Sequence, residues 1–228
     1  FKAAEAVQES ADALVLPAYE IEEGGRLGRA ASRIDGLLGG LGAHAVAQGD
    51  FAGKKGELLT LVLPAGVGAK RLVLAGLGKK EGFENETLRR LGAALMKSLG
   101  SRAAKVVVAL DDYGLGVRNT ENDLQAFAEG VHLAAYRFDR FMSEAKAPKL
   151  KRLILCDARG REASAARSGL KLAAAIAEGV AFARDLGNLP GNEGRPRILA
   201  AESRKMARKY GLAAKVLGEK EMEKEGMG

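Results

Sequence analysis

The sequence has no tryptophan, one cysteine and two histidines among its 228 residues. A single cysteine, Cys156, excludes an intrachain disulfide and a zinc site built from several cysteines, and it is typical of a reducing compartment such as the cytoplasm. Aromatic residues make up 5% of the chain, which leaves few rings for stacking on nucleic-acid bases. No run of about 18 apolar residues occurs, so we expect no membrane-spanning helix and no membrane partner.

What the chain does contain is an apolar share of 47%, enough for a packed core. Short runs of Val, Leu and Ile alternate with segments of helical period, the pattern of a sheet covered by helices. Because the runs are almost continuously apolar, they predict strands buried on both faces in a largely parallel or mixed sheet. The predicted strands are 13–16, 58–63, 71–75, 105–110, 152–156 and 212–217, and the helices cover 85–99, 120–135, 162–186 and 196–210.

Capping residues predict where these helices and strands begin and end. Asn85 and Gly100 are placed to cap the two ends of the first helix. Thr120, followed three residues later by Asp123, is similar to a capping box. Pro196 suits the first turn of the last helix, which Gly211 would end. In the same way, Pro17 and Pro64 are expected to end the first two strands.

The order of these segments predicts two domains, the second incomplete. We expect an N-terminal α/β domain over 1–158, a connector helix over 159–187 and the start of another α/β domain over 188–228. The last forty residues are too few to close a core. The chain begins at Phe1 without an initiator Met and ends at Gly228 inside what reads as a structural element, so we expect it to be a piece of a longer protein.

The net charge of +7 is unevenly distributed. Residues 1–136 are nearly balanced, whereas residues 137–228 carry 20 basic and 12 acidic side chains. The basic residues are densest over 137–152. Such a stretch is either a solvated face or subunit contact, or a surface for anions or nucleic acid.

The side chains that carry catalysis or bind metals form no recognisable set. His44 and His132 stand alone, without a second His or Cys at metal-ligand spacing. Asp111 and Asp112 are adjacent at a strand end, but successive side chains on a strand point to opposite faces, so a turn is the better interpretation. Cys156 lies in an apolar strand and is expected in the core.

Two glycine-rich segments are candidates for phosphate-binding loops. Gly76 and Gly78 follow a strand, as in a dinucleotide-binding fingerprint, but Glu81 stands where the third glycine belongs, which favours a tight turn. Residues 36–42 hold four glycines without a preceding strand or a following Lys-Ser or Lys-Thr, so they are not a P-loop. Residue chemistry therefore predicts no catalytic, cofactor-binding or metal-binding residue in this chain.

A series of sequence blocks does have a distinctive order. They read GDFAGKKGE at 49–57, KRLVLAGLGK at 70–79, LRRLG at 88–92, EGV at 129–131 with YRFD at 136–139, ARDLGNLPGN at 183–192, and EKEMEKEGMG at 219–228. In this order the blocks resemble the leucyl (cytosol) aminopeptidases over almost the whole chain. One departure is Arg195, which precedes Pro196 where the family usually has Thr.

The resemblance implies a two-domain metallopeptidase whose N-terminal domain has a macro-domain-like fold. Such enzymes are hydrolases that remove N-terminal residues from peptides with a water bridging two divalent ions, usually Zn, Mn or Mg, and they assemble as homo-hexamers. The family's metal-ligand blocks do not occur here. Residues 157–161 look similar to one of them, but Arg159 replaces its Glu and the segment precedes the junction at 183–192. We therefore expect a structural or oligomerisation role, no bound metal, and no catalysis by this chain alone.

Two alternative functions stay open. A macro-like fold could bind ADP-ribose or another nucleotide at the strand ends near Gly76 and Asp111. The basic second stretch could bind DNA through charge alone, in which case binding would weaken steeply with salt. The segment 114–119 matches no motif.

Overall fold

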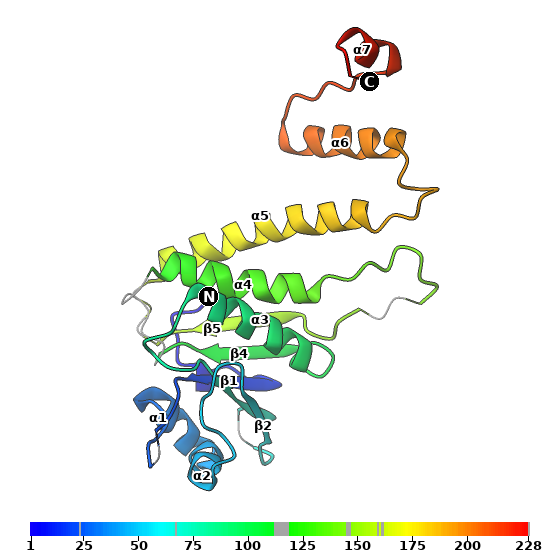
Figure 1. Ribbon diagram of the computed structural model, residues 1–228. Helices are drawn as coiled ribbons and strands as arrows, with labels where there is room; N and C mark the ends of the chain where they lie inside the picture. Colours follow the sequence, from blue (N-terminus) through cyan, green and yellow to red (C-terminus); the bar gives the residue numbers. More distant parts are fainter. Residues whose placement is uncertain are drawn as a thin grey trace. The chain divides into compact units, whose positions relative to one another are not determined.

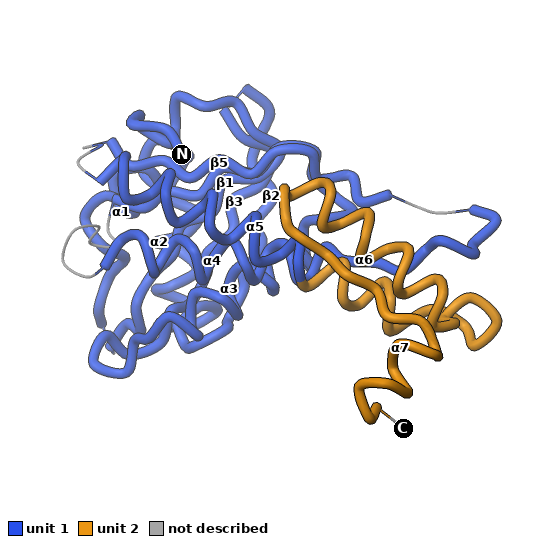
Figure 2. Tube along the Cα trace, turned by 90° about the horizontal axis from the view of Figure 1, so that it is seen from above, with its two compact units in different colours: residues 1–179 blue, residues 180–228 orange. Residues whose placement is uncertain are grey.

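The computed structural model describes residues 1–22, 24–66, 68–111, 119–144, 147–158, 160 and 162–227. These residues divide into two compact units, 1–179 and 180–228, which Figure 2 colours separately. The helix α5 runs through the limit between the units, and the domain boundaries at 158 and 187 stay predictions. The elements are η1 (Ala6–Gln8), β1 (Ala13–Ala18), α1 (Arg29–Leu37), α2 (Leu41–Gln48), β2 (Leu58–Val62), β3 (Arg71–Gly76), α3 (Asn85–Leu99), β4 (Lys105–Ala109), α4 (Thr120–Ala135), β5 (Arg152–Cys156), α5 (Ala163–Gly187), α6 (Pro196–Tyr210) and α7 (Glu219–Lys224), as labelled in Figure 1.

A five-stranded sheet in the order β2-β3-β1-β4-β5 forms the centre of the first unit. β1 pairs in parallel with β3 and β4, and β4 with β5, whereas β2 is antiparallel to β3. The predicted α/β fold with a mixed sheet is thus confirmed. Strands β1, β3 and β4 are buried along almost their whole length, as their apolar sequences require. β2 was expected to be buried on both faces and is not, because it ends the sheet.

Helices cover both faces of the sheet. Figure 1 shows α1 and α2 on one side and α3 and α4 on the other. Side chains along β1 alternate between the two layers, so Val15 packs with the α3/α4 layer and Leu14 with the α1/α2 layer. Among the described residues, no helix has the length and hydropathy that a membrane-spanning helix needs.

The helix starts differ slightly from the predictions. The N-cap of α3 is Glu84, and Asn85 is the first helical residue, while Gly100 ends the helix as predicted. At α4, the Asn119 side chain accepts a hydrogen bond from the Asn122 amide at 3.1 Å, so the predicted capping box at Thr120 is wrong. The N-cap of α4 therefore lies one residue before the predicted one, and Asn is as good an N-cap residue as Thr.

Two features of the first unit differ from what the sequence predicts. Pro17 does not stop β1. Strand β4 pairs with β1 only as far as Val15, so the absence of an N–H on Pro17 removes no hydrogen bond to β4. Helices α1 and α2 were not predicted. They are separated by Gly39 and Gly40 at φ 97° and 72°, conformations in the left-handed region that favours glycine.

The second unit contains the end of α5 together with α6 and α7. Helix α6 begins at Pro196 and ends at Gly211, which has φ 68°, as predicted. The predicted strand at 212–217 is wrong, because a strand needs a hydrogen-bonding neighbour and the described part of this unit contains no other strand. Among residues 180–227, only Ala207 is buried.

Candidate functional site

Acidic side chains lie where β4 and β5 end. The Asp111 carboxylate accepts a hydrogen bond from the Ala158 amide at 3.0 Å and thereby connects the segments that follow the two strands. Asp112, its predicted neighbour, lies outside the described residues. Asp123 and Asp157 are nearly fully buried. In the described ranges, no group of three or more His, Cys, Asp or Glu is arranged to hold a metal ion.

The histidines and the cysteine do not come together. His44 lies exposed on α2, and His132 lies exposed on α4. Cys156 is fully buried in β5, and this burial is the main cause that raises the pKa of its thiol to about 11. A thiol that stays protonated and out of contact with solvent is a core residue, as the sequence indicated.

The Gly76–Gly78 segment is the end of β3 and the two residues that follow it, not the predicted tight turn, and its amides are already engaged. Gly76 donates to the Glu57 carbonyl at 2.8 Å, Leu77 to the Ala18 carbonyl at 2.8 Å, and Gly78 to the Gly53 carbonyl at 2.9 Å. A Cβ at Gly76 would lie 2.0 Å from the Lys54 carbonyl oxygen, so glycine is required by the close approach of the 53–57 loop. No amide of this segment is left to bind a phosphate.

The second glycine-rich segment, 36–42, brings a carboxylate to a helix start. Asp35 accepts hydrogen bonds from the Gly42 and Ala43 amides, both at 2.8 Å, at the beginning of α2. A helix N-terminus attracts anions. Here the chain's own carboxylate occupies that position.

At the other end of the parallel strands, where they begin, Asp12 joins three strands. Its carboxylate, just before β1, accepts from Lys70 Nζ at 2.7 Å and from the Ala104 and Lys105 amides at 2.8 and 3.1 Å. The hydrogen bond from Lys70, followed by those from the two amides, lowers the pKa of Asp12 to about 2. The Asp12 carboxylate therefore holds segments of the fold together.

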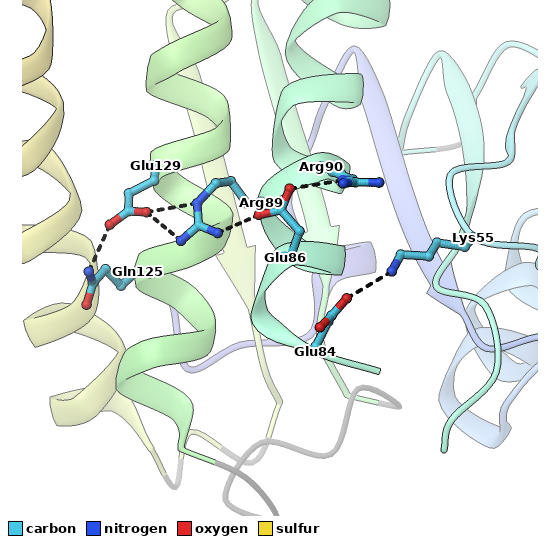
Figure 3. A network of polar contacts seen from close by, with 7 residues as sticks. All are labelled: Lys55, Glu84, Glu86, Arg89, Arg90, Gln125 and Glu129. Carbon is cyan, nitrogen blue, oxygen red and sulfur yellow. Dashed lines mark hydrogen bonds and ion pairs between the residues drawn. The ribbon is translucent and has the colours of Figure 1, made fainter. Parts of the chain in front are cut away.

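Figure 3 shows a network of ionic contacts between α3 and α4. Arg89 Nε and Nη2 donate to one oxygen of Glu129 at 3.0 and 2.8 Å, and Gln125 donates to the other at 2.8 Å. Arg89 also bonds Glu86 at 2.7 Å, and Arg90 bonds the second Glu86 oxygen at 2.9 Å. Glu86 and Glu129, in that order, raise the pKa of Arg89. Every oxygen of the two carboxylates thus has a partner, and the Arg89–Glu129 contact is the one that joins α3 to α4.

The same two helices approach each other through glycines. A Cβ on Gly130 would lie 1.9 Å from the Arg89 carbonyl oxygen, and one on Gly92 would lie 2.2 Å from that of Phe127. Likewise, a Cβ on Gly169 of α5 would lie 2.2 Å from the Glu121 carbonyl oxygen of α4. Close contact of α3, α4 and the first part of α5 therefore depends on the absence of side chains.

Several of the sequence blocks that carry the family resemblance contact each other in the structure. The 88–92 block contributes Arg89 and Gly92, and the 129–131 block supplies Glu129 and Gly130 opposite them. The 49–57 and 70–79 blocks meet where Gly53 accepts from Gly78. The blocks are visible in the sequence but their pairing is not, although the glycines within them are a usable signal.

A cavity of ≈ 850 Å³ lies between α2 and the chain that follows β1. Glu22 and Arg26 are its charged lining residues, and Ser32 already donates to the Leu27 carbonyl at 2.9 Å. A smaller groove of ≈ 310 Å³ runs beside β5 and includes His132. Ligand sites of this size use convergent polar groups to orient the ligand. The few polar groups in these linings supply no catalytic set.

The basic stretch 137–152 is exposed at every described Arg and Lys: Arg137, Arg140, Lys149, Lys151 and Arg152. Arg140 lies 5.7 Å above the ring of Phe141, which is itself exposed. Arg159 and Arg161 of the look-alike at 157–161 lie outside the described residues, as does most of 114–119.

Comparison with known proteins covers nearly all of the chain. The model of the cytosol aminopeptidase family, N-terminal domain, matches residues 4–145. A probable cytosol aminopeptidase of Nitrosococcus oceani is 37% identical over 224 residues, which are 95% of this chain and 43% of that protein. One from Azotobacter vinelandii is 38% identical over 212 residues, or 91% of this chain and 42% of the relative. Among solved structures, a mutant of tomato leucine aminopeptidase matches 97% of this chain and 44% of its own with a TM-score of 0.82 and 29% identity.

Proposed function

The chain belongs to the cytosol aminopeptidase family, and on this premise we propose that it forms the N-terminal domain, connector helix and adjoining segment of a leucyl aminopeptidase. The family match over residues 4–145 carries the proposal. The chain spans less than half the length of the relatives that it matches. We assign the hydrolysis of N-terminal residues from peptides to the whole enzyme, in the cytoplasm, as the relatives' names suggest.

Within that enzyme we assign these 228 residues a structural role. The carboxylates of Asp12, Asp35 and Glu129 and the amides of the Gly76–Gly78 segment all bond to the chain's own groups. The described side chains do not fit a two-metal centre, so no step of the hydrolysis is assigned to them. In this proposal the two divalent ions, Mn, Zn or Mg, are held by residues outside this sequence and supply the activated water.

Assembly as a homo-hexamer and a macro-like N-terminal fold belong to the same proposal, since both are implied by the family resemblance. The alternative of an ADP-ribose or nucleotide site has less support, because the amides of the Gly76–Gly78 segment are already bonded. Charge-driven DNA binding rests only on the exposed cations of 137–152.

A chimera tests the structural role directly. The matching segment of the Azotobacter vinelandii relative is replaced by this chain, and hydrolysis of leucine-p-nitroanilide is measured with added Mn²⁺. We expect activity within about tenfold of the parent relative, since the domain's role is structural. A chimera carrying Gly130→Val should lose soluble activity because the α3–α4 contact cannot form, while one carrying Gly179→Ala should keep it. A soluble, folded chimera without activity would contradict the proposal.

The chain alone provides the complementary assay. We expect no turnover above a no-protein control at any Mn²⁺ concentration, with the full-length relative as positive control. Turnover that a chelator abolishes would show that metal ligands are present in this chain and would move the catalytic role into it.

A further inference from the structure

The outer edge of β2 is an unpaired row of backbone groups. In the β2–β3 register, Leu63 donates to the Lys70 carbonyl at 3.1 Å, and Gly76 donates to the Glu57 carbonyl at 2.8 Å. Residues with odd numbers therefore bond to β3. Because backbone groups alternate in direction along a strand, those of Leu58, Thr60 and Val62 point away from the sheet. In the part of the chain that the structure describes, no hydrogen bond to these outward groups is found.

This edge lacks the features that usually prevent pairing. Edge strands in natural proteins carry charged residues, prolines or bulges that block a further strand. Residues 58–62 read LLTLV and contain none of these. Thr60 is exposed, and Val62 is 76% exposed. The other edge of the sheet is partly covered, since Lys2 donates to the Leu155 carbonyl at 2.8 Å and accepts from Asp157 at 3.2 Å.

We propose that β2 pairs with β2 of a second copy of the chain, antiparallel and with a two-fold axis at Thr60. In this register Thr60 faces its own counterpart, and each copy's Leu58 faces the other copy's Val62. All three outward residues then exchange both of their backbone hydrogen bonds with the facing residue. The two sheets join into one.

Self-complementarity is what favours a second copy over an unrelated strand. On the face of the sheet towards α1 and α2, the half-buried Leu59 meets Leu61 of the other copy, which extends an apolar layer. On the other face, Val62 covers Leu58. The nearest charged residues, Glu57 and Lys55, fall opposite the neutral Leu63 and Ala65, so no like charges oppose each other.

An extended peptide fits this edge less well. Peptides that add a strand gain specificity from pockets for alternate side chains. The ≈ 850 Å³ cavity and the groove beside β5 are lined by residues of other segments. A contact of one short strand buries far less than a standard interface, so we expect weak association that needs protein at about 100 μM or more.

Sedimentation equilibrium from about 5 to 500 μM tests the pairing. We expect concentration-dependent dimers for the native chain and at least tenfold weaker association for Thr60→Lys, because two like charges would face each other at the axis. Thr60→Asp should weaken association similarly, and a mixture of the two variants should form heterodimers. Ser101→Lys, at an exposed site after α3, adds the same charge as a control and should dimerise like the native chain. Unchanged thermal unfolding at 5 μM checks that the variants fold.

Cysteine cross-linking tests the register itself. Facing Cα atoms in this pair would be about 5.5 Å apart, within reach of a disulfide. Thr60→Cys should form a disulfide-linked dimer under mild oxidation, whereas Val62→Cys should not, because the two Val62 residues face Leu58. Native Cys156 is buried and contributes little background. A native chain that is monomeric up to 500 μM, association unaffected by Thr60→Lys, or equal cross-linking of both cysteine variants would each overturn the proposal.

Discussion

At the scale of single residues, the polar side chains of this chain bond to its own backbone and helices. Asp12 fixes the starts of three strands, Asp35 the start of α2 and Glu129 the contact of α3 with α4. None of these roles was visible in the sequence, because each depends on a partner distant along the chain. The sequence did indicate that His44, His132 and Cys156 lack the surroundings of ligands or nucleophiles, because such sites require several groups at defined spacing.

Asp12→Asn should lower the free energy of unfolding by about 1–2 kcal/mol at pH 7, an estimate reduced because Lys70 is largely exposed. The folded-state pKa of Asp12 is about 2, below the ordinary value of 3.8, so its contribution is present above pH 3.8 and is lost as the pH falls through 2. Urea unfolding of both proteins at pH 7 and pH 2 measures this. A difference that is the same at both pH values would show that the carboxylate charge is not the cause.

The thiol of Cys156 should react with a disulfide reagent only when the chain unfolds. Burial keeps the thiol protonated and out of contact with solvent, with a pKa of about 11. At pH 8 we expect the labelling rate to follow the rate of global unfolding and to rise with urea. The exposed thiol of Thr60→Cys provides the fast-reacting reference. Equally fast labelling of the native chain would contradict the burial of β5.

At the scale of helices and strands, glycine decides which elements can touch. Helices α3 and α4 meet at Gly92 and Gly130, and α4 meets α5 at Gly169. Elsewhere on α5, Gly179 faces open space, with nothing within 4 Å of an added Cβ. These contrasting positions provide matched substitutions.

Gly130→Ala should destabilise the first unit by about 2–4 kcal/mol, because the added Cβ would lie 1.9 Å from a backbone oxygen that cannot move freely. Gly179→Ala makes the same chemical change in an open helical position and should stabilise the chain by about 0.5–1 kcal/mol through helix propensity. Thermal or urea unfolding of the two variants gives the comparison. Equal effects of both substitutions would mean that α3 and α4 are not in close contact.

The Arg89–Glu129 pair should contribute more than the Arg90–Glu86 pair beside it. Glu129 is 10% exposed and accepts two hydrogen bonds from one guanidinium, whereas Arg90 is 69% exposed. Double-mutant cycles with Arg→Met and Glu→Gln should give a coupling energy of about 1–2 kcal/mol for the first pair and a clearly smaller one for the second, whose two side chains are exposed. The reverse order would show that burial does not strengthen the first pair.

Sequence patterns predicted the elements whose signal is local. All five strands of the sheet were located because Val, Leu and Ile runs mark buried strands, and Gly100 and Gly211 mark the ends of α3 and α6. Helices α1 and α2 were missed because the glycines around 36–42 obscure the helical period. The strand predicted at 212–217 failed for another reason, since an extended apolar segment becomes a strand only beside a partner.

At the scale of the whole molecule, burial is concentrated in the first unit. The sheet and its two helical layers contain nearly all the buried apolar residues, whereas only Ala207 is buried among residues 180–227. Ordering a residue costs about 1–2 kcal/mol of conformational entropy, which so little burial cannot offset. We therefore propose that residues 188–228 depend for their order on further parts of the enzyme or on a neighbouring chain.

Hydrogen exchange of the chain by itself should show this difference. We expect amides of β1, β3, β4, α3 and α4 to exchange only through global unfolding, and those of 199–217 to exchange within seconds to minutes. Residues 1–156 expressed alone should keep the slow set. Strong protection throughout 199–217 in a monomer would place the boundary elsewhere.

The order of strands in the sheet also has a consequence for synthesis on the ribosome. Strand β1 is made first but lies at the centre, and its neighbour β4 pairs Val106 with Ala13 from 93 residues further along the chain. At translation rates of about 5–20 residues per second, β1 would wait about 5–20 seconds for β4. During that time at least one side of the nascent ALVLPA segment has no strand to pair with, because β3 is the only one of its two neighbours made before β4. This makes the segment the natural first binding site for a ribosome-associated chaperone.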